Sequence, residues 1–415
     1  MKKSKGDKRP YLKPVTRIEL SEKNIKQRVI LLVVLLAVAA AALFTGVREL
    51  LKVEPGIQEI EVASQKPNCS QEFVLMYDFS DYGGSAANVN RELNRIYGAA
   101  TEKAFALFSP DVEDATIQNL FLVNRHVNET VTVDPVLYRA FEQIREAENR
   151  CLYLAPAYVE YNRIFLCENE QEAAMYDPAF NEEQREYLLE LASFVSDPAH
   201  IDLELLPENV VRLNISQEYL AFAQEYGIET FLDFGWMKNA FIADYLAQVL
   251  TENGFTRGYL SSFDGYTRNL DPREESYSVN LFSRQGQDVF MPAKLNYTGA
   301  MSLVSLRDFP MSEKDRWHYF VYSDGSITHS FLDPKDGRSK CALSSLTGYS
   351  REAGCADILL DLIPVFVTED FQPEVLEDLA QQGILAVWCQ NQTLETNGSE
   401  GFLELLDESF SLKTK

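Results

Sequence analysis

Several signatures of common enzyme classes are missing from these 415 residues. There is no Gly-rich loop of the P-loop or dinucleotide type and no G-x-S-x-G motif, so nothing indicates a P-loop NTPase, a dinucleotide fold or an α/β-hydrolase. The four histidines are scattered and form no H-E-x-x-H pair. No two cysteines form C-x-x-C, so neither a zinc site nor thioredoxin-like chemistry is predicted.

Cysteine is scarce, with six residues in the chain: Cys69, Cys151, Cys167, Cys341, Cys355 and Cys389. An even number outside the cytoplasm is compatible with disulfides. The short separations of Cys151 from Cys167 and of Cys341 from Cys355 suggest two such bonds. Isolated apolar thiols explain the same pattern equally well.

Basic residues become scarce after the N-terminal tail. Residues 1–28 hold ten Lys or Arg and three acids, a net charge of +7, whereas the remainder holds 28 basic and 60 acidic residues, a net charge of −32. A surface this acidic repels phosphate backbones and anionic lipid headgroups. We therefore expect no nucleic-acid partner.

The one long apolar run is Val29 to Val47, VILLVVLLAVAAAALFTGV. As a helix these 19 residues would extend roughly 28 Å, close to the thickness of a bilayer core. The positive-inside rule keeps the basic tail in the cytoplasm and translocates the rest. A cleaved signal peptide is the alternative, because Ala39 to Ala42 offers small residues of the kind a peptidase needs, but the charged region and the apolar run are both long for a signal.

Apolar spacing predicts helices and strands without a steady βα rhythm, which indicates an α+β fold. Predicted helices cover 86–108, 135–147, 182–195, 216–226, 238–253 and 357–363. Predicted strands cover 72–77, 130–133, 209–215, 231–234, 259–262, 277–282, 317–322, 327–331 and 383–388.

Two segments are more specific than the rest. The first, Leu232 to Tyr266, begins LDFGWMKNAFIAD, and the second, His329 to Ile363, contains HSFLDPKDG and CADILLD. They resemble the motifs L-D-L-G-G-I-A-K-G-Y-A-A-D, H-H-I-L-D-P-x-T-G and A-D-A-L-A-T-A of the FAD:protein FMN transferase (ApbE-like) family. A looser resemblance runs through FSPDVEDATIQNLFLVN (Phe108 to Asn124), so about Glu72 to Asn391 is covered.

The resemblance implies one mixed α/β flavin-transferase domain behind a single transmembrane helix. It implies Mg²⁺-dependent transfer of FMN from FAD to a threonine of an exported redox protein, which would be the partner. The implied regions are a basic cytoplasmic tail (1–28), a transmembrane helix (29–47), a stalk (48–70), the transferase-like domain (71–395) and an acidic C-terminal tail (396–415).

The same resemblance indicates where the site residues lie. Asp357 matches the metal-binding Asp of the family and would be the catalytic residue, and we expect Asp361 and Lys238 to join it at the metal site. The positions implied for cofactor binding are Asp233, Asn239, Phe263, Asp264, Gly265, His329 and Asp333.

Several motif positions depart from the family pattern. The family lysine falls on Asn239, and Lys238 stands where alanine is expected, about 100° away around a helix. The Gly-Gly-Asn turn becomes Phe263-Asp264-Gly265, and Ser330 replaces the second histidine. Each change removes a charge or a close backbone approach that a flavin nucleotide would use.

The last block keeps Asp357 and has Asp361 in place of threonine, four residues later on one helical face. Two carboxylates so placed could hold a hard cation such as Mg²⁺, although two solvated acids in a very acidic protein explain the pattern as well. Three hypotheses follow: an active, extracytoplasmic FMN transferase-like protein; an inactive relative that binds flavin or a partner at the outer membrane face; and a structural domain without ligand.

Overall fold

The computed structural model describes residues 24–50, 53–62, 64–312, 314–398 and 402–414. The chain divides by its contacts into two units, Met1–Val53 and Glu54–Lys415. Most of the predicted basic tail, residues 1–23, lies outside the described residues.

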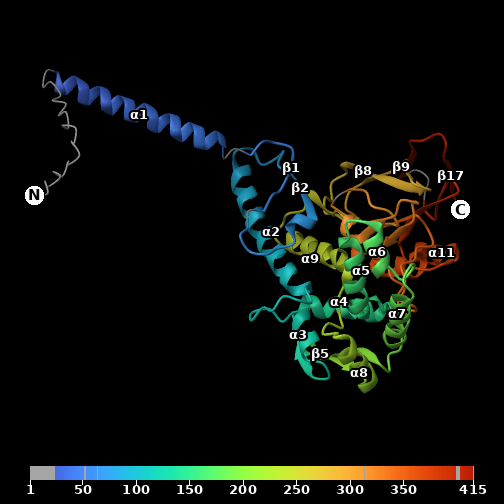
Figure 1. Cartoon of the computed structure of the whole chain (residues 1–415). Coiled ribbons are helices and arrows are strands. Elements are labelled where there is room, and N and C mark those ends of the chain that lie inside the picture. The colour runs from blue at the N-terminus through green and yellow to red at the C-terminus, as the bar shows by residue number, and fades with distance from the viewer. Residues whose placement is uncertain (1–23, 51–52, 63, 313, 399–401, 415) are drawn as a thin grey trace, which may run out of the picture. The chain divides into compact units, whose positions relative to one another are not determined.

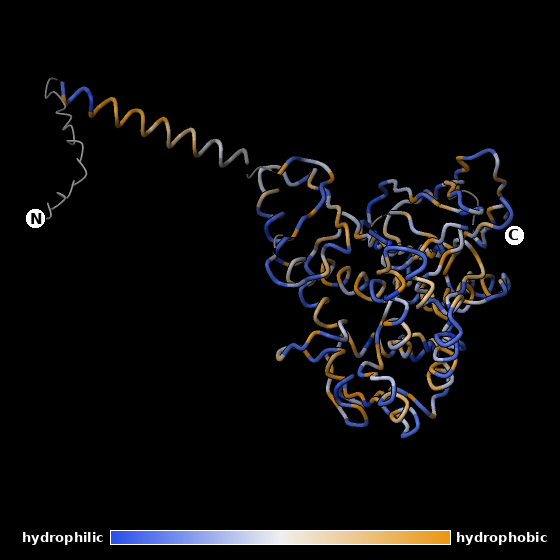
Figure 2. Tube along the Cα trace, in the orientation of Figure 1, coloured by the Kyte–Doolittle hydropathy of each residue, from blue (hydrophilic) through white to orange (hydrophobic). Residues whose placement is uncertain are grey.

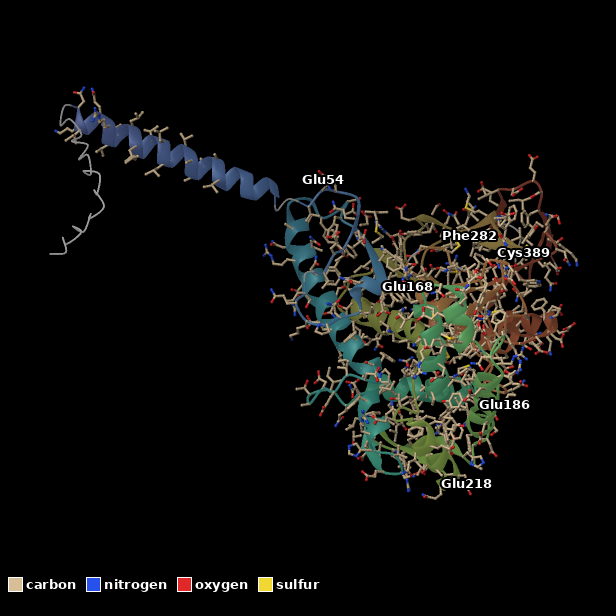
Figure 3. All side chains as sticks on the ribbon, viewed as in Figure 1. Glu54, Glu168, Glu186, Glu218, Phe282 and Cys389 are labelled. Carbon is tan, nitrogen blue, oxygen red and sulfur yellow. The ribbon has the colours of Figure 1, made fainter. Side chains whose placement is uncertain are left out.

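The first unit contains one helix, α1 (Ile25–Leu50), within the residues described there. Its stretch Ile25–Leu43 is long and apolar enough to cross a membrane by length and composition, and none of it is buried. Figure 2 colours the first turn of this stretch as hydrophilic and the rest as a nearly continuous hydrophobic run, and Figure 3 shows its side chains standing off on every side. The predicted helix 29–47 therefore lies inside α1.

The second unit mixes helices and strands. Its helices are α2 (Ala86–Phe108), α3 (Leu120–Arg125), α4 (Pro135–Glu146), α5 (Ala155–Leu166), α6 (Glu170–Tyr176), α7 (Glu182–Val195), α8 (Gln217–Tyr226), α9 (Lys238–Glu252), α10 (Cys355–Phe366) and α11 (Pro373–Gln381). Short 3₁₀ turns lie at Ser70–Glu72, Gly83–Ser85, Cys151–Leu154, Gly235–Met237 and Arg316–His318.

The strands form one large sheet and three small ones among the described residues. The large sheet has the order β1 (Ile57–Glu59), β2 (Phe73–Asp78), β6 (Gly258–Ser262), β7 (Tyr266–Asn269), β10 (Met301–Arg307), β13 (Ser345–Ser350), β14 (Leu385–Gln390), β15 (Thr393–Thr396) and β17 (Ser411–Thr414). Its neighbours are antiparallel except for the parallel pair β15–β17. The small sheets are β16 (Leu403–Leu405), β9 (Asp288–Thr298) and β8 (Ser276–Gln285); β3 (Thr130–Thr132), β5 (Val210–Ile215) and β4 (Ile201–Leu206); and β11 (Tyr319–Val321) with β12 (Ile327–His329).

The large sheet is covered on both faces. On one face α9 and α10 pack against its central strands, and α2 lies beside α9 (Figure 1). Gly348 in β13 permits this approach, because a Cβ there would lie only 2.7 Å from a methyl carbon of Leu362 in α10. On the other face, Leu295 of β9 joins Leu303 and Val387 of the large sheet in a common core. This layered arrangement confirms the predicted α+β fold.

Most predicted elements coincide with observed ones, and helices 86–108 and 182–195 coincide at both ends. The predicted strand 231–234 is wrong. The backbone N–H groups of Phe231 and Leu232 donate to the side-chain oxygen of Asn124, at 3.0 and 2.9 Å. Asp233 N–H donates to the carbonyl of Leu152 at 3.0 Å. The segment is extended, but it is hydrogen-bonded to the side chain of Asn124 and to the 3₁₀ turn at Cys151–Leu154 instead of to a neighbouring strand.

Both ends of the second unit are more structured than a stalk and a tail. β1, within the predicted stalk, pairs with β2. β16 and β17, within the segment 396–415, pair with β9 and β15. The suggested disulfides are also absent, since all six cysteines are free thiols.

Candidate functional site

Two adjoining cavities share Gly235, Lys238 and His318, and together they are called the Gly235 cleft here. The larger has a volume of about 890 Å³ and the smaller about 230 Å³. Residues from five segments line the larger cavity: 59–62, 70–73, 235–239, 263–264 and 314–318. The volume of the larger cavity is within the range of small-molecule sites.

A tight turn at Gly235 brings the start of α9 into the cleft. Gly235 has a φ of 52°, and a Cβ there would overlap the ring of Tyr158, at 2.5 Å. The turn is closed by Asp233, whose Oδ1 accepts the Gly235 N–H at 2.9 Å. Only glycine satisfies both the positive φ and the close approach of the ring, so Gly235 fixes the position of the two residues that follow on α9, Lys238 and Asn239.

Asp233 lines the smaller cavity and is half-buried. Burial raises the pKa of its carboxyl to about 6, while the Gly235 N–H bond and the Lys238 ammonium oppose that rise. A carboxyl with a pKa near neutrality can accept and release a proton under ordinary conditions.

Asp233→Asn gives a pH-dependent prediction. A carboxyl with a raised folded-state pKa stabilises the fold below its unfolded pKa and loses that contribution as pH rises through the folded value. The shift from 3.8 to about 6 corresponds to about 2–3 kcal/mol. Relative to wild type, the variant should therefore gain little at pH 4 and about 2–3 kcal/mol at pH 7, measured by urea unfolding. Glu113→Gln, at an exposed loop carboxyl, is the control, and a gain for Asp233→Asn that is equal at both pH values contradicts the assignment.

Lys238 forms an ion pair with an acidic residue. Its ammonium lies 3.2 Å from Oε2 of Glu72 and 3.4 Å from Oε1. Burial alone would lower the pKa of Lys238, but Glu72 outweighs burial and the net shift is upward. The Lys238 charge is present in the cleft but largely neutralised by Glu72.

Asn239 and Asp264 meet at the bottom of the cleft. Nδ2 of Asn239 donates to Oδ2 of Asp264 at 3.0 Å. Oδ1 of Asn239 and Oδ1 of Asp264 are both buried, and neither has a hydrogen-bond partner among the described residues. Burial raises the pKa of the Asp264 carboxyl, and the nearby His318 opposes that rise.

Gly265 completes the turn that carries Asp264. Its φ is 111°, and a Cβ there would overlap the carbonyl oxygen of Ser305 on β10. The Ser305 N–H donates to the Gly265 carbonyl at 2.9 Å. Phe263, the first residue of the turn, lies under the ammonium of Lys314, 3.9 Å from the ring centroid.

His318 is a cleft residue that the sequence pattern does not single out. It lines both cavities, and its Nδ1 lies 3.3 Å from Oγ of Ser330. Burial lowers the pKa of His318, and Asp264 opposes the shift. Ser330 stands where the resembled motif has its second histidine. This substitution is the one feature of the sequence that draws attention to the surroundings of His318.

His329 and Asp333 lie outside the cleft. His329 is buried, its Nδ1 lies 2.8 Å from Oγ of Ser339, and burial lowers its pKa to about 3. Asp333 closes a turn, accepting the Lys335 N–H at 2.9 Å and pairing with Lys340 at 3.2 Å. His329 is therefore the last residue of a paired strand, and Asp333 stabilises the turn that follows it.

Asp357, the first of the two carboxylates on α10, lies at another cavity. Asp357 lines a space of about 580 Å³ that also includes Arg268. Its Oδ2 accepts the Gly354 N–H at 3.2 Å and its Oδ1 accepts Nε2 of Gln143 at 2.6 Å. Burial, followed by repulsion from Asp357, raises the pKa of Asp361. Within the described ranges no group of three or more His, Cys, Asp or Glu residues could hold a metal ion.

Asp244 lines the same cavity as Asp357 and contacts the start of α10. Its carboxylate pairs with Arg268 and accepts the N–H groups of Cys355 and Ala356, at 2.9 and 2.8 Å. Asp244, which keeps the residue of the resembled motif, therefore joins α9 to α10.

No family model and no curated protein sequence matches the chain. The fold matches the ApbE protein of Thermotoga maritima, with a TM-score of 0.53 and 15% identity over 80% of this chain and 93% of that one. It also matches the flavin transferase ApbE of Vibrio cholerae, with a TM-score of 0.50 and 12% identity over 85% and 98% of the two chains. At these identities the likeness shows a common fold, as the motif resemblance implies.

Proposed function

We propose that this chain is a membrane-anchored, extracytoplasmic binding protein built on a flavin-transferase fold, and that it binds its ligand in the Gly235 cleft without transferring FMN. One observation carries the proposal. The only lysine on this part of α9, Lys238, is paired with Glu72 at 3.2 Å, and the adjacent motif position is the neutral Asn239. Among the described residues of this part of α9, no unpaired cation is left for the phosphates of FAD.

The charge balance of the cleft supports the loss of flavin transfer. Glu59, Glu61, Glu72, Asp264 and Asp315 contribute five carboxylates to the larger cavity, against the ammonium groups of Lys238 and Lys314. Two like unit charges about 5 Å apart repel by about 3 kcal/mol at an effective dielectric constant of about 20. One such repulsion weakens binding of a pyrophosphate by about a hundredfold.

Active flavin transfer is the second candidate, and Asp233 favours it. A carboxyl with a pKa of about 6, next to the cleft, has the properties of a general base that could take the proton of an acceptor threonine. The acceptor would then be an exported redox protein, as the resemblance implies.

Magnesium belongs to this second candidate. Of the three positions implied for the metal, Asp357 and Asp361 lie one turn apart on α10, whereas the ammonium of Lys238 lies in the Gly235 cleft and is no metal ligand. Two carboxylates suffice for Mg²⁺ only where water and substrate phosphates complete its octahedral shell. When bound, the ion would neutralise pyrophosphate charge, with Asp357 and Asp361 as its protein ligands.

The anchor follows from α1 and the charges around it. Residues 1–28 carry a net charge of +7 and would remain in the cytoplasm, which places Glu54–Lys415 outside. A tether of this kind concentrates the cleft near ligands at the outer surface of the membrane.

Incubation of the full-length chain in detergent micelles with FAD tests the two functions, with Mg²⁺ or chelator and a threonine-containing acceptor peptide. We expect no flavin-labelled peptide and no AMP release under either condition. Mg²⁺-dependent labelling that Asp357→Asn with Asp361→Asn abolishes would establish the second candidate instead. A known flavin transferase serves as the positive control.

A further inference from the structure

The bottom of the Gly235 cleft presents unused hydrogen-bond acceptors. Asn239 is 6% exposed and lines the larger cavity. Because its Nδ2 donates to Asp264, its Oδ1 must accept, yet neither this oxygen nor Oδ1 of Asp264 has a partner within the described part of the chain. Buried acceptors of this kind are best satisfied by a donor. The fully ionised pyrophosphate of FAD offers none at neutral pH, whereas an ammonium or guanidinium group offers several.

The ion pairs inside the cleft neutralise only some of its carboxylates, so its lining keeps a net negative charge. Glu72 is neutralised by Lys238 at 3.2 Å. Asp315 receives Arg307 at 3.3 Å and two backbone N–H groups. The carboxylates of Glu59 and Glu61 in the exposed part of the lining, and of Asp264 at the bottom, have no ion pair among the described residues. This distribution attracts a cation from the entrance to the bottom of the cleft.

A cation of the protein itself already occupies an aromatic face in the cleft. The ammonium of Lys314 lies 3.9 Å from the ring centroid of Phe263. Trp317, which also lines the larger cavity, is 50% exposed and offers a second ring. Rings near carboxylates form the usual environment for organic cations. Lys314 therefore shows the kind of group that this surface accepts.

We propose that the Gly235 cleft binds an organic cation, an alkylammonium or guanidinium group, whose N–H groups donate to Oδ1 of Asn239 and Oδ1 of Asp264. The inference rests on the proposed function, in which the cleft binds a ligand without flavin transfer. The cation comes either from a free polyamine or from a basic side chain of an exported protein. Lys314 competes with it for the face of Phe263.

Calorimetric titration of the full-length chain in detergent micelles tests the inference with two probes, spermidine and a short peptide that has a blocked N-terminus and contains one lysine. The same peptide with an acetylated lysine is the ligand control. We expect saturable binding of at least one amine probe, none of the acetylated peptide, and weaker binding at high salt because the attraction is electrostatic. Spermidine binding alone indicates a free amine as ligand, and tighter peptide binding indicates a basic side chain.

Three variants locate the site. Asp264→Asn and Asn239→Leu should each weaken binding at least tenfold, and Lys314→Ala should strengthen it about threefold, since it removes the internal competitor. Glu186→Gln, at an exposed acid on α7 that Figure 3 labels, makes the same charge change as Asp264→Asn and should leave binding unaltered. Melting curves confirm that each variant is folded.

Absence of saturable binding of both amine probes to folded wild type, or binding that Asp264→Asn and Asn239→Leu leave unchanged, would overturn the inference. This outcome is distinct from failure of the proposed function, which the appearance of flavin-labelled acceptor in the same preparation would reveal.

Discussion

Asn124→Ala is expected to destabilise the second unit by about 3–5 kcal/mol. Asn124 is 4% exposed, its Oδ1 accepts the N–H groups of Phe231 and Leu232, and its Nδ2 donates to the carbonyl of Leu232 at 3.0 Å. Alanine would leave three buried backbone groups without partners, each costing about 1–3 kcal/mol before relaxation. Urea unfolding followed by circular dichroism measures the loss.

The same variant should also weaken ligand binding, because the segment that Asn124 holds leads directly into Asp233 and Gly235. Asn94→Ala is the matched control. Asn94 lies on α2 and its side chain bonds only to Asn90, at 2.9 and 3.1 Å, so its replacement should change stability by no more than about 0.5 kcal/mol. Equal destabilisation by the two variants would contradict the role assigned to Asn124.

Lysine at three positions of α1 is expected to release the protein from the membrane. Leu35, Leu36 and Val38 are exposed in the apolar run, and each lysine near the centre of a membrane helix costs about 2.5–3.5 kcal/mol in insertion. The combined cost of roughly 8–10 kcal/mol exceeds what the remaining apolar residues of this run contribute. Fractionation of cells into membrane and soluble material measures the shift.

Leu35→Ala, Leu36→Ala and Val38→Ala together form the control, which should remain in the membrane because it adds no charge. External protease added to intact cells then tests the topology. Digestion of Glu54–Lys415 with protection of the N-terminal tail is expected. Triple-lysine protein that stays in the membrane fraction, or a second unit that is protected, would contradict the proposed anchor.

Periodicity recovers the elements whose apolar faces are set locally. The stripe at Leu188 and Leu191 marks α7, and both residues are buried. The segment Phe231–Phe234 is wrongly predicted as a strand, because its hydrogen-bond partner Asn124 lies 108 residues from Leu232 and leaves no mark on the local pattern. Local pattern cannot separate a strand from an extended segment bound by one side chain, since both alternate in the same way.

The residues of the site also fall into two groups, those that the motif comparison indicates and those that it misses. Asp233, Asn239 and Asp264 are three of the positions implied for cofactor binding, and in the structure all three line the Gly235 cleft. The motif comparison does not find His318, whose position depends on the pairing of Tyr319 with His329 in a separate hairpin. Nor does spacing reveal that His329 is buried against Ser339. Side chains brought together by tertiary pairing carry no local signal.

The central claim, a cleft that binds ligand but does not transfer flavin, is tested most directly by FAD itself. Titration of the full-length chain in Mg²⁺, followed by flavin fluorescence and mass spectrometry of the acceptor peptide, should give no saturable FAD binding up to high micromolar concentration and no added FMN. Introducing the missing cation with Asn239→Lys, together with Glu72→Gln to free Lys238, should produce measurable FAD binding. Saturable binding by wild type with FMN attached to the peptide would contradict the account.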